Sequence, residues 1–106
     1  MSRVVITMPK QARPGEIIEI KTLAAHAMET GFRRTERGEL LPRDIIRRFV
    51  CSYNGVEVFR AELHPAIAAN PLIAFNTVAT ESGTLSFQWI GDNGFAVTET
   101  APIRVE

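Results

Sequence analysis

Residues 49–59 read FVCSYNGVEVF, two short apolar runs joined by an Asn-Gly pair. Asn54 and Gly55 suit a two-residue type I′ turn, because both central positions of that turn need a positive φ. The stretch therefore predicts an antiparallel hairpin with Tyr53 opposite Val56. The same register places Cys51, the single cysteine of the chain, opposite Val58.

The rest of the chain repeats this pattern of short runs and turns. Proline and glycine recur at short intervals, and the runs between them are rich in Val, Ile, Phe and Thr. This spacing is typical of an all-β sandwich and not of alternating strands and helices. Residues 24–41 have no clean period and predict a long polar loop, and residues 64–69 predict a short helical turn. We expect about seven antiparallel strands, at 3–7, 16–23, 44–53, 56–63, 72–80, 84–90 and 95–105, with the last one broken at Pro102.

Length and composition set wider limits. The chain has 106 residues, of which 45% are hydrophobic, which suits one domain over residues 1–106 with a core of its own. A formal net charge of zero argues against a nucleic-acid-binding domain. No apolar run has the length of a membrane span, and the first ten residues, MSRVVITMPK, predict a strand and not a secretory signal. A single cysteine excludes an internal disulfide framework.

A second hairpin is expected at residues 83–100. Leu85, Phe87 and Trp89 share one face of its first strand and predict the centre of the core. The turn falls at 91–94, and its length is left open by the sequence. A three-residue loop places Trp89 with Val97, whereas a loop of two or four residues places it with Thr98.

The first hairpin is apolar on both faces, which a surface hairpin of a monomeric sandwich should not be. We expect the face with the more continuous apolar positions to join the core and the other to form a patch for a partner protein, with Tyr53 as its anchor. The alternative is that the loop at 24–41 covers this patch. The expected core face carries Ile46, Val50, Phe59, Ala61 and Leu63. The expected partner interface comprises Phe49, Cys51, Tyr53, Val56 and Val58, rimmed by Arg47, Arg60 and Glu62.

Cys51 has three possible roles, as a nucleophile, a metal ligand or a small buried hydrophobe. Its place inside a strand between Phe49 and Tyr53 favours the last. Neither His26 nor His64 lies at a recognisable catalytic or zinc-binding spacing, and Cys51, His64 and Met28 do not follow the order of a blue-copper loop. The residues therefore indicate no metal, no cofactor and no catalytic machinery.

Six arginines crowd residues 33–48 and could bind an oxyanion through their guanidinium groups. Glu36, Glu39 and Asp44 are interleaved with them, which favours local ion pairing and partner recognition instead. The arginines are Arg33, Arg34, Arg37, Arg43, Arg47 and Arg48.

Four blocks of the chain resemble the SoxZ family, and they keep the family's order. The blocks are HAMETG (26–31), LPRDIIRRFVCSYNGVEVF (41–59), LHPAIAANPLIAF (63–75) and ESGTLSFQWIGDNG (81–94). One departure is Ala27, where the family usually has a proline, which should loosen that loop.

The resemblance implies an immunoglobulin-like sandwich that pairs with SoxY, the covalent carrier of sulfur intermediates in bacterial thiosulfate oxidation. It also implies a non-catalytic subunit without a cofactor, in which Cys51 does not bear the sulfur. A periplasmic location, export together with SoxY and contact with other Sox enzymes through the complex follow from the same resemblance. Two other functions stay open: a sulfurtransferase that uses Cys51, and a stand-alone sandwich that binds a small oxyanion at the arginines. Self-association of the isolated chain is also possible.

Overall fold

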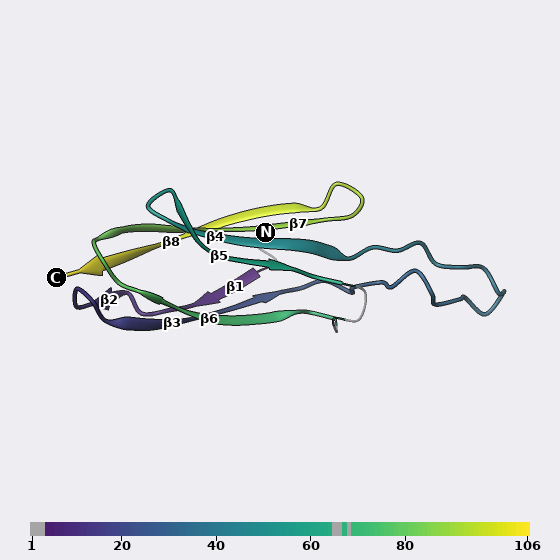
Figure 1. Cartoon of the computed structure of the whole chain (residues 1–106). Helices are drawn as coiled ribbons and strands as arrows, with labels where there is room; N and C mark the ends of the chain where they lie inside the picture. Colours follow the sequence, from purple (N-terminus) through teal and green to yellow (C-terminus); the bar gives the residue numbers. More distant parts are fainter. Residues whose placement is uncertain (1–3, 65–66, 68) are drawn as a thin grey trace.

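The computed structural model describes residues 4–64, 67 and 69–106, which form two β-sheets (Figure 1). A three-stranded sheet has the order β1-β3-β6, and a five-stranded sheet has the order β2-β8-β7-β4-β5. All pairings are antiparallel except that of β2 with β8. The strands are β1 (Val4–Thr7), β2 (Gln11–Ala12), β3 (Ile17–Ala24), β4 (Ile46–Tyr53), β5 (Val56–Glu62), β6 (Leu72–Val78), β7 (Gly83–Gly91) and β8 (Ala96–Val105).

The predicted all-β sandwich is confirmed, with eight strands where about seven were expected. The additional strand, β2, has only two residues, which is too short to carry a periodic signal. The expected break at Pro102 is wrong, because β8 runs through it. On its side opposite β7, β8 pairs with β2 only at Arg104 and Val105. Pro102 therefore has no strand partner on that side, and a strand edge of this kind tolerates proline.

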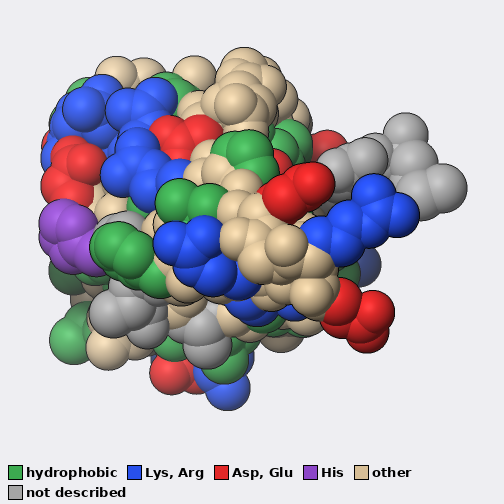
Figure 2. All heavy atoms as spheres, turned by 90° about the vertical axis from the view of Figure 1, so that its right-hand side faces the viewer, with side chains coloured by type: hydrophobic (Ala, Val, Ile, Leu, Met, Phe, Trp, Pro, Cys, Tyr) green, Lys and Arg blue, Asp and Glu red, His purple; other side chains and the backbone are tan. Residues whose placement is uncertain are grey.

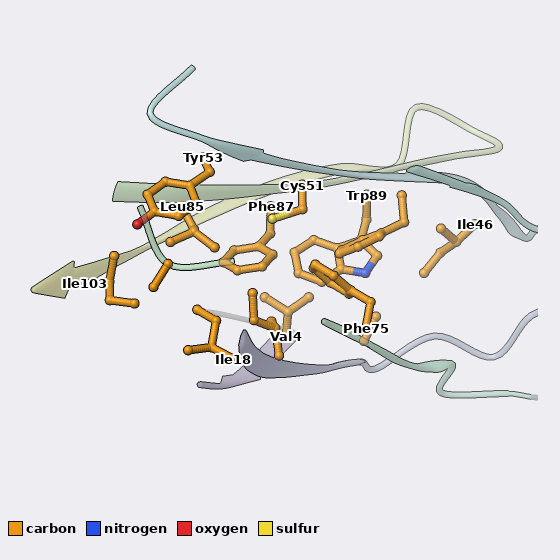
Figure 3. Close-up of a cluster of buried hydrophobic side chains, with 14 of the residues drawn as sticks. Val4, Ile18, Ile46, Cys51, Tyr53, Phe75, Leu85, Phe87, Trp89 and Ile103 are labelled. Atoms are coloured by element: carbon orange, nitrogen blue, oxygen red, sulfur yellow. The ribbon is translucent and has the colours of Figure 1, made fainter. Parts of the chain in front are cut away.

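The core lies between the sheets and is dominated by aromatic rings of the larger one (Figure 3). Leu85, Phe87 and Trp89 of β7 have no exposed surface, which confirms their predicted place at the centre. The ring of Phe49, from β4, lies 5.1 Å from that of Trp89 and 6.0 Å from that of Phe75 on β6, centroid to centroid. The core therefore joins the two sheets through these aromatic side chains.

The turn between β7 and β8 has three residues. Trp89 pairs with Val97, and the Gly91 N–H donates to the Phe95 carbonyl at 2.8 Å, so the three-residue alternative is confirmed. Gly91 also lies against the start of β4: a Cβ atom at this position would be 2.5 Å from the carbonyl oxygen of Ile45. Only glycine allows the turn to approach β4 so closely.

The molecule is elongated, 59 Å long and about 20 Å in the other two directions. Most of the extra length comes from residues 25–45, which leave the sandwich as a projecting arm (Figure 1). Backbone pairing between Glu29 and Asp44 and between Arg34 and Leu40 holds the two halves of the arm together. The arm therefore does not cover the β4–β5 hairpin. The alternative that the loop at 24–41 covers the patch on this hairpin is wrong.

Two further sequence predictions concern segments outside the strands. The predicted helical turn at 64–69 includes residues 65, 66 and 68, which lie outside the described residues. In the described part of the chain, no helix has the length and apolar character needed to cross a membrane.

Candidate functional site

The β4–β5 hairpin has a different register from the predicted one. Asn54 and Gly55 have φ values of 50° and 83°, as the type I′ turn requires. Tyr53 pairs with Val56 as predicted, but Cys51 pairs with Phe59 and not with Val58, because a β-bulge follows the turn. Val58 is the extra residue of this bulge. Relative to β4, every later residue of β5 therefore lies on the opposite side of the hairpin from the predicted one.

The predicted roles of the two faces of the hairpin are reversed on β4, whereas the bulge brings Phe59 and Ala61 of β5, with Leu63 after it, to the core side, so these three pack against the core as predicted. Phe49 and Cys51 have no exposed surface and Tyr53 has 5%, so the residues expected at an interface lie in the core. Val56 and Val58 remain exposed at the edge of the sheet, beside Arg60. Exposed Arg47 lies near the other end of the hairpin, six residues from Tyr53 and roughly 20 Å away along the strand. The contiguous surface that the sequence predicted is therefore wrong.

Ile46 and Val50 were expected on the same face of β4, but they lie on opposite faces. A second irregularity, between Ile46 and Arg48 in the pairing with β7, turns Ile46 into the core, as predicted. Val50 lies opposite Arg60 and is only partly buried. The expected core face thus contains both buried residues and residues of the outer surface.

Cys51 lies at the middle of β4, between Phe87 of β7 and Phe59 of β5. Burial raises the pKa of its thiol to about 12, so the thiol stays protonated at neutral pH. A nucleophilic cysteine needs the thiolate and access to its substrate, and this side chain has neither. Within residues 4–64, 67 and 69–106, no group of three or more His, Cys, Asp or Glu side chains is placed to hold a metal ion. The interpretation of Cys51 as a small buried hydrophobe is confirmed.

Tyr53 has a structural role at the opposite end of the sandwich from the arm. Its hydroxyl donates to the carbonyl of Glu81 and accepts the N–H groups of Thr80 and Glu81 at 3.3 Å. Beside it, the side-chain oxygen of Asn54 accepts the N–H of Thr84 at 2.9 Å. These bonds tie the β4–β5 turn to the segment between β6 and β7, and so close one end of the fold.

The arginines of residues 33–48 mostly have partners within the chain. Arg33 pairs with Glu29 at 2.6 Å, and Arg34 donates to the Gly38 carbonyl at 2.8 Å. Arg48 pairs with Glu62 at 3.3 Å across the β4–β5 hairpin. Ion pairing of the arginines is confirmed, but their partners are Glu29, Glu62 and Asp92, and not the interleaved Glu36, Glu39 and Asp44 from which it was predicted.

Asp92 binds two further arginines of that segment, Arg43 and Arg47, at the base of the arm. Its carboxylate accepts two hydrogen bonds from Arg43, at 2.9 and 3.0 Å, and lies 3.2 Å from Nε of Arg47. It also accepts the N–H of Ile45 at 3.2 Å. The hydrogen bonds from Arg43, and then those of the Ile45 backbone, lower the pKa of Asp92 below its ordinary value. This one carboxylate engages both arginines and cancels one of their two positive charges, so their guanidinium groups already have a ligand within the chain.

The segment HAMETG packs around the same base. The Nδ1 atom of His26 accepts the Met28 N–H at 2.9 Å, which leaves Nε2 as the proton-bearing nitrogen of the neutral ring, 3.7 Å from Asp44. Met28 has a positive φ of 53°, and its sulfur accepts the N–H of Ile46 at 3.2 Å. His26 also packs edge-on against Phe95. These contacts give the segment a structural role, in setting the direction of the arm.

The outer part of the arm is exposed and mixed in charge. Phe32 has 82% of its surface exposed, the largest exposed fraction among the large hydrophobic side chains of the described residues, and Leu40 has 52%. Viewed onto this end, basic side chains gather at the upper left with acidic ones beside them, and both kinds recur toward the right (Figure 2). The arm thus presents an exposed aromatic side chain, Phe32, to the solvent.

These features agree with the comparison of the sequence with known families. Residues 6–102 match the model of the sulphur oxidation protein SoxZ. The chain belongs to the SoxZ family. Proteins of this family act in the periplasmic Sox system and are generally non-catalytic subunits of its carrier complex. A search of curated proteins finds no match.

Solved structures show the same fold at low sequence identity. A SoxY sulfur carrier protein from Chlorobium limicola superposes with a TM-score of 0.68 and 10% identity, over 100% of this chain and 81% of that one. A superoxide reductase (neelaredoxin) from Ignicoccus hospitalis gives 0.76 and 16%, over 97% of this chain and 80% of that one. At these identities the likeness shows the fold alone. The two-sheet sandwich of this chain is therefore shared with a sulfur carrier protein and with a superoxide reductase.

The roles of two groups of residues were not predicted from the sequence. The role of Asp92 was missed because its partners, Arg43 and Arg47, lie more than forty residues away in the chain. The second group lies on the outer face of β3, where Ile17 and Leu23 are exposed. Its signal was present in the run IIEIKTLA (17–24), which is apolar on both faces of a strand.

Proposed function

We propose that this chain is the non-catalytic subunit that binds and supports a SoxY-type protein, the covalent carrier of sulfur intermediates in thiosulfate oxidation. The observation that carries the proposal is the burial of Cys51 in a chain of the SoxZ family. The single thiol of the chain is protonated and inaccessible, so a carried sulfur must reside on another protein. In this proposal the chain is exported to the periplasm together with its carrier, and other Sox enzymes meet it through the complex.

The two alternative functions lose support for physical reasons. A sulfurtransferase using Cys51 would need a thiolate at the surface, and burial opposes both conditions. A stand-alone oxyanion site at the arginines would compete with Glu29, Asp92 and Glu62, three carboxylates that already form ion pairs with four of them. Isothermal titration of the isolated chain with thiosulfate or sulfate should accordingly give no saturable binding.

The proposal is tested by reconstitution with the SoxY protein of the same organism. The two chains should co-purify as a complex, and thiosulfate should load sulfur onto the SoxY thiol in that complex. A complex containing Cys51→Ala in this chain should load sulfur to the same extent, as read by intact-mass spectrometry. Loss of loading in a folded Cys51→Ala complex would contradict the proposal, as would sulfur found on this chain in the wild-type complex.

The location of the interface remains a prediction. Of the residues expected there from the sequence, Val56, Val58, Arg47 and Arg60 are exposed and accessible to a partner. They stay candidates at the edge of β5 and at the base of the arm.

A further inference from the structure

The outer face of the three-stranded sheet carries two rows of exposed aliphatic side chains. Val5 of β1 pairs with Leu23 of β3, and Leu23 pairs with Leu72 of β6, so the three lie side by side across the whole sheet. Their exposed fractions are 60%, 41% and 66%. Toward the other end of the face, Ile17 pairs with Val78, at 70% and 45%. These five residues form what we call the aliphatic face.

The outer face of the five-stranded sheet is different. Strands β4 and β5, at one edge of that sheet, carry the ion pairs Arg48–Glu62, at 3.3 Å, and Arg60–Glu57, at 2.8 Å. On β7 and β8 the exposed outward positions include Thr84, Gln88, Thr98 and Thr100. An antiparallel sheet that faces water alternates apolar inward with polar outward, and this sheet follows that rule. The aliphatic face breaks it, with five of the ten exposed large hydrophobic side chains among the described residues.

The charges of the aliphatic face cancel each other. Between its two rows lie Glu19 and Lys21, whose side chains pair with one another at 3.6 Å. Exposed Thr7, Ala74 and Asn76 complete the middle of the face and carry no charge. A neutral face of this kind does not recruit a polyanion or a polycation, and it matches another neutral, apolar protein surface.

The size of the face indicates the size of its partner. Eight residues of β3 extend about 26 Å, and three strands span about 10 Å between the outer two, so the footprint is on the order of 300 Å². A stable complex buries roughly 800 Å² on each partner. The arm leaves β3 directly after Ala24, next to the row of Val5, Leu23 and Leu72, and provides further surface at that end. The face thus suits a folded domain that reaches onto the arm, and is broader than one extended peptide needs.

We infer that the aliphatic face is the surface on which the SoxY-type carrier docks, sheet against sheet. This inference rests on the proposed function for the identity of the partner. The SoxY structure from Chlorobium limicola has the same two-sheet fold, so a carrier of this type has sheet faces of matching dimensions. Two such faces pack about 10 Å apart with interdigitating side chains, and rows of Leu, Val and Ile fill that space.

The test compares two double variants of this chain in complex with the purified SoxY protein of the same organism. The face variant is Leu23→Thr with Leu72→Thr, and the control is Val56→Thr with Val58→Thr at the edge of β5. Both replace two exposed aliphatic side chains by a polar residue that strands favour. We expect the face variant to raise the Kd at least about 30-fold, as loss of a central apolar contact does, and the control to change it less than about threefold.

Thermal unfolding of each variant ensures that only folded chains are compared. If the face variant does not fold, Ile17→Thr with Val78→Thr tests the second row in the same way. An unchanged Kd for the face variants, or an equal loss in the control, would overturn the inference. If only the control variant binds SoxY more weakly, the partner docks at the edge of β5, as predicted from the sequence. That result would also overturn the inference about the aliphatic face.

Two further outcomes separate the inference from the proposed function. If the wild-type chain does not bind SoxY at all, the proposed function fails, and with it the identity of the partner. If light scattering shows a wild-type homodimer that the face variant dissociates while SoxY affinity stays the same, the face serves a second copy and the inference fails alone. Hydrogen exchange should show protection of β3 and β6 in the wild-type complex, and exchange that is unchanged there would count against the inference.

Discussion

Replacing Cys51 by alanine should make the stability of the chain less sensitive to alkaline pH. At pH 7 the variant loses a buried sulfur atom, comparable in size to a methylene group, from a site with no exposed surface. The lost transfer free energy and the small cavity together cost about 1–2 kcal/mol. At neutral pH the wild-type chain should therefore be the more stable of the two.

The order should reverse at high pH. The pKa of the Cys51 thiol is about 12 in the folded chain, against 9.0 when it is free of the fold. Above pH 9 the unfolded chain releases this proton and the folded chain keeps it, so the wild type loses about 1.4 kcal/mol of stability per pH unit up to pH 12. The alanine variant has no such contribution, and all other groups titrate alike in the two chains. The two free energies of unfolding should meet near pH 10.

Urea denaturation in the presence of a reductant, at pH 7, 9, 10 and 10.5, measures this difference. A difference that stays constant up to pH 10.5 would refute the assignment of Cys51 as a buried, protonated thiol. A second measurement uses a thiol reagent at pH 8, where the native chain should react only as fast as it opens. Stoichiometric reaction within seconds in the absence of urea would also contradict it.

Three further predictions concern the bulge, the arm and the turn. Deletion of Val58, the extra residue of the bulge, should cost at most about 1 kcal/mol in urea denaturation, whereas deletion of Arg60 should turn Glu62 toward the core and cost several times more. Asp92→Asn should lower the free energy of unfolding by roughly 1 kcal/mol at pH 7, because its arginine partners are half exposed. Folding lowers the pKa of Asp92, so its carboxylate stabilises the fold above the ordinary pKa of 3.8, and this stabilisation is lost as the pH falls below that value. The free energies of unfolding of the variant and the wild type, measured by urea denaturation, should therefore converge as the pH falls below 4. Gly91→Ala should lower the Tm by several degrees, because the new Cβ would lie 2.5 Å from a backbone carbonyl oxygen, and an unchanged Tm would show that the turn can move away.

The local predictions succeeded where a few neighbouring residues decide the conformation. Asn54-Gly55 required positive φ at two positions, and both were found. The alternation of Leu85, Phe87 and Trp89 fixed which side of β7 faces the core. The fold class follows from such local rules, because turn residues and period-2 alternation act within a few positions of the chain.

The predicted interface surface was wrong because Phe49, Cys51 and Tyr53 face the other sheet. The hairpin register was wrong for a separate reason: a bulge at Val58 brings Phe59 and Ala61 to the same side as Cys51, and a sequence cannot show a bulge until the partners of the strand are known. Phe49, Cys51 and Tyr53 were correctly recognised as one apolar face, but the sequence does not say which of two apolar faces meets the other sheet.

By itself, the sequence determined the class of the fold, the positions of most strands, the chemistry of a lone strand cysteine and the resemblance to the SoxZ family. Only the tertiary structure decided which surfaces stay exposed. The approach of β7 against β4 gave Asp92 its two arginines, and the pairing of β1, β3 and β6 aligned Val5, Leu23 and Leu72 into one row. The physical reason is that alternation assigns a side chain to one of two faces, whereas burial depends on which of those faces another part of the chain covers.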